Sequence, residues 1–149
     1  ESDLSRALRR AARRGVRVRL LLSSAWYVRE ENRALADRFE EWASANDASL
    51  SVRLADPSGR YEKIHAKGAV VDDRRVVLGS LNWNEQAATS NREVVLLLQG
   101  REVADYYGGV FDADWQGGSS PIPYGLLAAL AGCLGLAAIV GGKIEFERQ

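Results

Sequence analysis

The chain has 149 residues, which is enough for one ordinary domain with its own hydrophobic core. Its 46% hydrophobic and 27% charged residues exclude wholesale disorder. Twenty basic and 20 acidic residues give a net charge of zero, so no global electrostatic argument supports a nucleic-acid or anionic-membrane partner.

Helices and strands are expected to alternate through residue 115, which indicates an α/β layered sheet. Ser2 or Asp3 begins a predicted helix that runs to about Arg14, and Gly15 follows it as a left-handed terminator. The other predicted elements are a strand at 16–22, a helix at 29–45, strands at 49–54, 63–71, 75–78 and 92–98, and a helix at 100–115. The strand at 16–22 is expected to become buried toward its C-terminal end, and the strand at 92–98 is expected to be buried.

Two helical faces in the first half have simple interpretations. The first helix carries a basic face, which solvation explains and which an anion could also occupy. Its residues are Arg6, Arg9, Arg10, Arg13 and Arg14. In the second helix, Leu35, Phe39 and Trp42 recur at helical spacing and are expected to pack in the core.

The end of the chain is predicted to be a membrane anchor. Residues 116–123 read as a linker, residues 124–142 carry no charge, and residues 143–149 form a short polar tail. From Gly125 to Gly142 a helix would be about 27 Å long, close to the thickness of a hydrocarbon core. The flanking charges favour a cytoplasmic tail and an extracytoplasmic domain.

The only histidine of the chain, His65, lies two residues from Lys67 in the predicted strand at 63–71. Alternation along a strand would place both side chains on one face. Ser80 and Asn82 follow the next predicted strand and are expected to approach that face. A titratable imidazole, a fixed cation and two neutral hydrogen-bonding groups predict a site for a phosphate group.

The spacing of these residues resembles the HKD motif of the phospholipase D superfamily, which here reads His65-x-Lys67-x4-Asp72 and then Gly79-Ser80-x-Asn82. The resemblance extends from about Leu4 to Trp115 and includes Glu93 in the "SNREVVLLL" segment. It implies a layered α/β/α HKD domain at 1–115, followed by the linker and the transmembrane helix.

The family resemblance also implies roles for these residues. His65 would attack phosphorus to form a phosphohistidine, and Lys67, Asn82 and Ser80 would bind the phosphate oxygens. Asp72 would be an orienting or structural carboxylate, and Glu93 would accept a hydrogen bond from the imidazole. The resemblance implies no cofactor and no metal.

One histidine can serve as nucleophile or as acid, so the family mechanism requires a second HKD half. A homodimer would supply it, and so would an upstream half, which is the favoured interpretation because the chain lacks methionine and begins at Glu1. We expect a phospholipid-directed phospholipase D or cardiolipin synthase-like enzyme at a membrane. The alternatives are a dimeric metal-independent endonuclease and a non-catalytic membrane-anchored interaction module. Trp26, Tyr27 and Trp83 could line an acyl or base pocket, but packing in the core or at the rim is the favoured interpretation for each.

Overall fold

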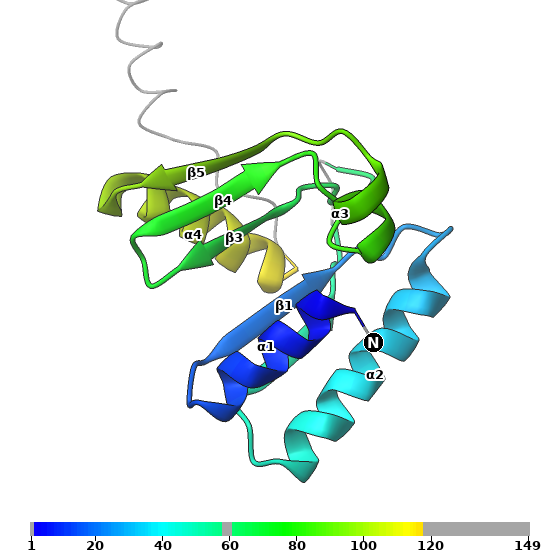
Figure 1. Cartoon of the computed structure of the whole chain (residues 1–149). Coiled ribbons are helices and arrows are strands. Elements are labelled where there is room, and N and C mark those ends of the chain that lie inside the picture. The colour runs from blue at the N-terminus through cyan, green and yellow to red at the C-terminus, as the bar shows by residue number, and fades with distance from the viewer. Residues whose placement is uncertain (1, 58–60, 118–149) are drawn as a thin grey trace, which may run out of the picture.

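A computed structural model describes residues 2–57 and 61–117 of the chain (Figure 1). The elements in chain order are α1 (Asp3–Arg13), β1 (Val18–Leu22), α2 (Arg29–Ala45), β2 (Leu50–Leu54), β3 (Gly68–Val71), β4 (Arg75–Gly79), α3 (Glu85–Ser90), β5 (Val95–Gln99) and α4 (Arg101–Trp115). Strands β1 and β2 pair in parallel, and β3, β4 and β5 form an antiparallel sheet in that order. This mixed α/β arrangement confirms the predicted fold class.

The two ends of α1 follow the signals in its sequence. The Ser2 side chain accepts a hydrogen bond from the Ser5 amide and so caps the first turn. At the other end Gly15 adopts a φ of +85°, and its amide donates to the carbonyl of Ala12. The helix therefore starts and stops where the sequence predicts.

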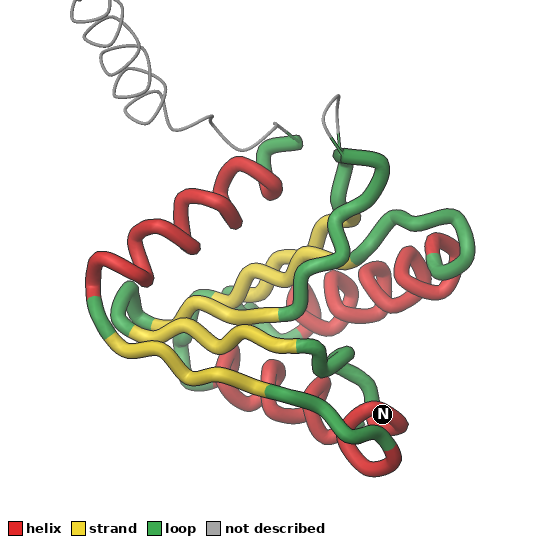
Figure 2. The backbone as a smooth tube through the Cα atoms, turned by 90° about the horizontal axis from the view of Figure 1, so that it is seen from above, coloured by secondary structure: helices red, strands yellow, loops and turns green. Residues whose placement is uncertain are grey.

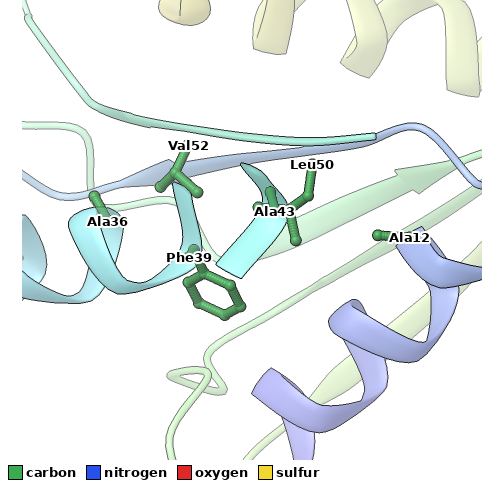
Figure 3. Packing of buried hydrophobic residues seen from close by; sticks show 6 residues of the cluster. All are labelled: Ala12, Ala36, Phe39, Ala43, Leu50 and Val52. Atoms are coloured by element: carbon green, nitrogen blue, oxygen red, sulfur yellow. The ribbon is translucent and has the colours of Figure 1, made fainter. Parts of the chain in front are cut away.

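The core of the first half lies between α1, α2 and the β1–β2 sheet. Phe39 of α2 is only 1% exposed, and the buried side chains gather around it (Figure 3). The buried cluster consists of Ala12, Ala36, Phe39, Ala43, Leu50 and Val52. Full burial of one aromatic side chain contributes roughly 1.5–3 kcal/mol, so Phe39 is a main stabilising residue of this part of the fold.

The arginines of α1 also take part in this packing. The guanidinium of Arg9 lies 5.2 Å from the ring centroids of both Phe39 and Trp42, and that of Arg13 lies 5.2 Å from the Trp42 ring. Arg13 in addition donates to the side-chain oxygen of Asn46 at 2.9 Å. Two of the five cations of the predicted basic face therefore stabilise the contact between α1 and α2.

Helix α4 packs on the β3–β4–β5 sheet and also contacts the β1–β2 sheet (Figures 1 and 2). Arg19 of β1 forms an ion pair with Asp112 at 2.7 Å. Arg53 of β2 donates to the carbonyl of Trp115 at 2.9 Å and lies 4.7 Å from the centroid of its ring. These contacts attach the two sheets to one helix.

Two predictions about strands differ from the fold, and one helix was not predicted. The strand expected at 63–71 begins only at Gly68, because β4 ends at Gly79 and offers no further partner. The expected burial of β5 is wrong: Leu96 is 55% and Leu97 58% exposed. In the described ranges β5 is an edge strand, which pairs with β4 alone. Helix α3 was not anticipated. Its start depends on Asn84, whose side chain accepts from the Ala87 amide at 2.8 Å.

The membrane-anchor prediction falls on residues that the structure does not describe. The proposed span at 124–142, the tail at 143–149 and most of the linker lie outside the described ranges. Within 2–57 and 61–117, no helix combines the length and apolar character needed to span a bilayer.

Candidate functional site

The motif residues His65 and Lys67 lie in a segment without regular secondary structure just before β3, not on a strand face as predicted. The last backbone hydrogen bond of the hairpin runs from the amide of Gly79 to the carbonyl of Lys67, at 3.2 Å. Lys67 Nζ donates to the backbone carbonyl of His65 at 2.7 Å, so the ammonium group of Lys67 lies beside the backbone of His65. His65 itself is exposed, so another molecule can reach its imidazole.

Gly79 allows the end of β4 to come very close to β5. A Cβ atom at this position would lie 2.1 Å from the carbonyl oxygen of Val94. Directly after the glycine, the amide of Ser80 donates to that carbonyl at 3.0 Å, and the amide of Val94 donates to Ser80 Oγ at 3.2 Å. The close approach therefore fixes Ser80 at the end of β4, the central strand of this sheet, beside the start of β5.

Glu93 is held by neutral hydrogen-bond donors. Ser80 Oγ donates to its Oε2, and Asn91 Nδ2 donates to its Oε1 at 2.9 Å. These hydrogen bonds, first that of Ser80 and then that of Asn91, lower the pKa of the Glu93 carboxyl, and Lys67 lowers it further. Both carboxylate oxygens thus have partners other than the imidazole that the family resemblance suggested. Within the described part of the chain the His65 ring makes no hydrogen bond.

Lys67 is under the influence of two other charged groups. Desolvation is the largest effect that lowers the pKa of its ammonium group, and the charge of Lys63 lowers it further. Glu93 acts in the opposite direction and raises the pKa of Lys67. The structure therefore adds Lys63 to the candidate site. The only signal in the sequence was a second lysine two residues before His65.

The loop that follows Ser80 carries Asn82 and Trp83. The amide of Asn84 donates to the carbonyl of Asn82 at 2.8 Å, and Asn84 also caps α3. The loop is thereby held at Ser80 by β5 and at Asn84 by α3. The side chain of Asn82 is exposed and available to a ligand.

Asp72, the last residue of the motif, is not brought to this site. It lies in the turn between β3 and β4, at the opposite end of β3 from Lys67. Its φ is +53° and that of Asp73 is +49°, a left-handed conformation that aspartate adopts more readily than most residues. The structure therefore places Asp72 in this turn, away from the Lys67 end of β3.

In the part of the chain that the structure describes, no group of three or more His, Cys, Asp or Glu side chains could hold a metal ion. The positive charge near His65 comes from Lys67 and Lys63. The arrangement offers an accessible imidazole, two cations and a hydroxyl group that is ordered by a carboxylate. These are the groups that bind and attack a phosphoryl centre.

The family described as "Cardiolipin synthase, PLD-like domain" matches residues 1–115. The chain belongs to the phospholipase D-like family. Mitochondrial cardiolipin hydrolase of Xenopus tropicalis is 34% identical over 114 residues, which cover 76% of this chain and 49% of that protein. Phospholipase D of Rickettsia prowazekii is 29% identical over 107 residues, which cover 72% of this chain and 47% of that protein.

A solved structure of NucT from Helicobacter pylori has the same fold. It superposes with a TM-score of 0.61 at 23% identity and covers 80% of this chain and 74% of its own. The chain spans about half the length of the curated phospholipase D-like relatives it matches. Family and fold are thus shown, and both agree with the resemblance seen in the motif.

Proposed function

We propose that this phospholipase D-like chain catalyses phosphodiester hydrolysis or transfer on phospholipids, through a phosphohistidine at His65. The observation that carries this proposal is the exposed His65 beside Lys67, next to the end of β4 where Ser80 bonds to Glu93. An accessible imidazole next to a cation is suited to attack on phosphorus, because the ammonium stabilises charge on the phosphoryl oxygens.

The reaction would proceed in two displacements. The unprotonated nitrogen of His65 attacks phosphorus, a P–N bond forms, and the P–O bond to the leaving alcohol breaks. A second imidazole gives its proton to the leaving oxygen and then, as a base, takes one from water or from an acceptor alcohol. That water or alcohol attacks phosphorus and breaks the P–N bond. Lys67 and Asn82 would hold the non-bridging oxygens throughout.

The second imidazole has to come from outside these 149 residues, because His65 is their only histidine. A second copy of the chain would supply it at a two-fold axis, and another HKD half of the same polypeptide would do so as well. Either arrangement needs both rings at one phosphorus atom. The exposure of His65 supports such a shared site.

Phospholipid is the preferred substrate class for two reasons. The curated relatives carry the names cardiolipin hydrolase and phospholipase D. In addition, Arg9 and Arg13 of the first helix pack on Trp42, which leaves fewer cations for a nucleic-acid backbone. The predicted span at 124–142 would keep the site beside a bilayer, with the domain on the extracytoplasmic side.

The test is turnover of two substrates without added metal. Vesicles with labelled phosphatidylglycerol and a labelled single-stranded DNA are incubated with the wild-type protein, with His65→Ala and with the remote control Tyr106→Ala. We expect lipid turnover by wild type and control and none by His65→Ala. Cleavage of DNA alone would instead favour the endonuclease. Inactivity of the wild type on both substrates, in a preparation that contains both HKD halves, would favour the non-catalytic module.

The covalent step has its own readout. A phosphohistidine survives alkali and is lost in acid, so a protein quenched in alkali with a substrate labelled at phosphorus should retain the label at His65. Lys67→Ala should retain the nucleophile but lower the yield of the labelled protein. Full turnover by His65→Ala would contradict the mechanism.

A further inference from the structure

The loop between β1 and α2 presents two aromatic side chains to solvent, Trp26 and Tyr27. Trp26 is 88% exposed and Tyr27 is 52% exposed. Their rings meet edge to face, with centroids 5.6 Å apart and an interplanar angle of 88°. We call this pair the aromatic rim. Exposing an indole to this extent has no advantage for the stability of the domain.

The backbone that carries the aromatic rim is well supported. The side chain of Ser23 accepts from the amide of Ala25 at 3.2 Å, and the amide of Val28 donates to the carbonyl of Ala25 at 3.0 Å. Asn32 of α2 donates from Nδ2 to the carbonyl of Ser23 at 2.7 Å. These hydrogen bonds stabilise the loop at the carboxyl end of β1, and its two aromatic rings are exposed to solvent.

Lys63 connects the aromatic rim to the candidate site. Its Nζ lies 5.5 Å from the centroid of the Tyr27 ring, and its charge lowers the pKa of Lys67. The loop after β1 and the segment before β3 lie on the same side of the molecule (Figure 2). A surface that receives Trp26 and Tyr27 would therefore also meet Lys63, and the phosphate site would be next to it.

The chemistry of the aromatic rim fits a bilayer interface better than a nucleic acid. Tryptophan and tyrosine have an apolar ring with a polar tip and are enriched at the level of the lipid headgroups. A binding site for single strands also places aromatic rings under bases, but it needs a positively charged groove along the backbone. Here Arg29 is followed by Glu30 and Glu31 in the first turn of α2, so the charges around the rim nearly balance.

We propose that the aromatic rim inserts into the interfacial region of a phospholipid bilayer and so presents a headgroup phosphodiester to His65. Lys63 contacts the lipid phosphates at the same surface. The inference rests on the proposed function for the identity of the substrate. It goes further by assigning the surface that meets the lipid. Because the aromatic contribution dominates, binding through the rim should depend little on salt.

A first experiment locates Trp26 relative to the bilayer. The full chain is reconstituted in vesicles that contain brominated lipids, and tryptophan quenching is compared for wild type, Trp26→Phe and Trp115→Phe. Residues 116–149 contain no tryptophan, so the predicted span adds no signal. We expect Trp26→Phe to remove most of the quenching and Trp115→Phe to leave it unchanged. Equal quenching in wild type and Trp26→Phe would overturn the inference.

A second experiment separates the rim from the chemistry. Turnover is measured on phosphatidylglycerol in vesicles and on a short-chain phosphatidylglycerol that stays monomeric. Trp26→Ala should show a several-fold loss on vesicles and wild-type rates on the monomeric lipid. Tyr106→Ala, which removes an aromatic side chain that is 67% exposed on α4, should match the wild type on both.

The outcomes distinguish two failures. If Trp26→Ala equals the wild type on vesicles, or loses the same factor on both lipids, the rim does not dock on the bilayer. If the wild type, with both HKD halves present, turns over neither lipid, the proposed function fails. The quenching experiment then still decides whether Trp26 enters the bilayer. A rim that instead binds single-stranded DNA, with binding lost in Trp26→Ala and no quenching by brominated lipid, also contradicts the inference.

Discussion

Ser80 and Glu93 join the end of β4 to the start of β5 through a hydrogen bond from the serine hydroxyl to the glutamate carboxylate. The same hydroxyl accepts a hydrogen bond from the amide of Val94 at 3.2 Å, so Ser80, which follows β4, makes two hydrogen bonds to the residues just before β5. Glu93 is in turn close enough to Lys67 to raise its pKa. The contact between the ends of β4 and β5 therefore positions the Glu93 carboxylate, and this carboxylate affects the pKa of Lys67 in the candidate phosphate site.

Replacement of Glu93 by glutamine should make stability less dependent on acid pH. The pKa of Glu93 is lowered from 4.5 in the folded protein, mainly by the hydrogen bonds of Ser80 and Asn91. A lowered carboxyl pKa contributes stability above the unfolded value and loses it as the pH falls through the folded value. Urea unfolding of wild type and Glu93→Gln between pH 7 and about 2 measures this. The stability difference should shrink below 4.5, and a constant difference would contradict the assignment.

The alkaline limb of the pH–rate profile should report on Lys63. In the proposed mechanism, phosphate binding needs the protonated form of Lys67, whose pKa is lowered from 10.5 by desolvation and then by Lys63. Removal of the second cation in Lys63→Gln should raise the pKa of Lys67 and move the alkaline limb to higher pH. A limb at the same pH in Lys63→Gln and wild type would mean that Lys63 does not influence the site. Arg74→Gln, in the turn at the other end of β3, is the matched control for loss of one cation.

Local signals in the sequence were sufficient for the three predicted helices, although they did not indicate the short helix α3. The helix predicted at 29–45 was confirmed with its limits unchanged, since its apolar residues recur at helical spacing around Phe39. A strand is different, because it exists only where a partner strand pairs with it. The pattern at 63–71 looked like one strand, but the end of β4 at Gly79 limits β3 to four residues.

The candidate site was predictable in its composition but not in its contacts. Motif spacing indicated His65, Lys67 and Ser80, and these three lie near one end of the β3–β4 hairpin. Spacing could not reveal that Glu93 bonds to Ser80 rather than to the imidazole, because that depends on how β4 approaches β5. For the same reason, sequence alone gave no role to Lys63.

Variants of Asp72 can separate its place in the motif from its place in the fold. Asp72 has a φ of +53° in the turn after β3, and asparagine tolerates this conformation whereas a β-branched residue does not. We expect Asp72→Asn to keep the stability and the rate of the wild type. Asp72→Val should lower the free energy of unfolding by about 1–2 kcal/mol and keep the rate per folded molecule. Loss of catalysis in a fully stable Asp72→Asn would instead assign the carboxylate a chemical role.

Two glycine-to-alanine variants test the close approach between β4 and β5. A Cβ at Gly79 would lie 2.1 Å from the Val94 carbonyl oxygen and 3.0 Å from the Val95 Cα, so the two strands must separate there. Gly108 in α4 has no atom within 4 Å of the corresponding position. Gly79→Ala should therefore lose about 1–3 kcal/mol of stability, whereas Gly108→Ala should gain roughly 0.5–1 kcal/mol because alanine restricts the unfolded chain.

Denaturant midpoints give the stability of both glycine variants, and lipid turnover gives their activity. Because the separation displaces Ser80 from the Val94 amide and Glu93, Gly79→Ala should also lower turnover under conditions where it is still folded. Gly108→Ala should keep the wild-type rate. A Gly79→Ala protein that is as stable and as active as the wild type would mean that the end of β4 does not need its present contact with β5 to hold the site.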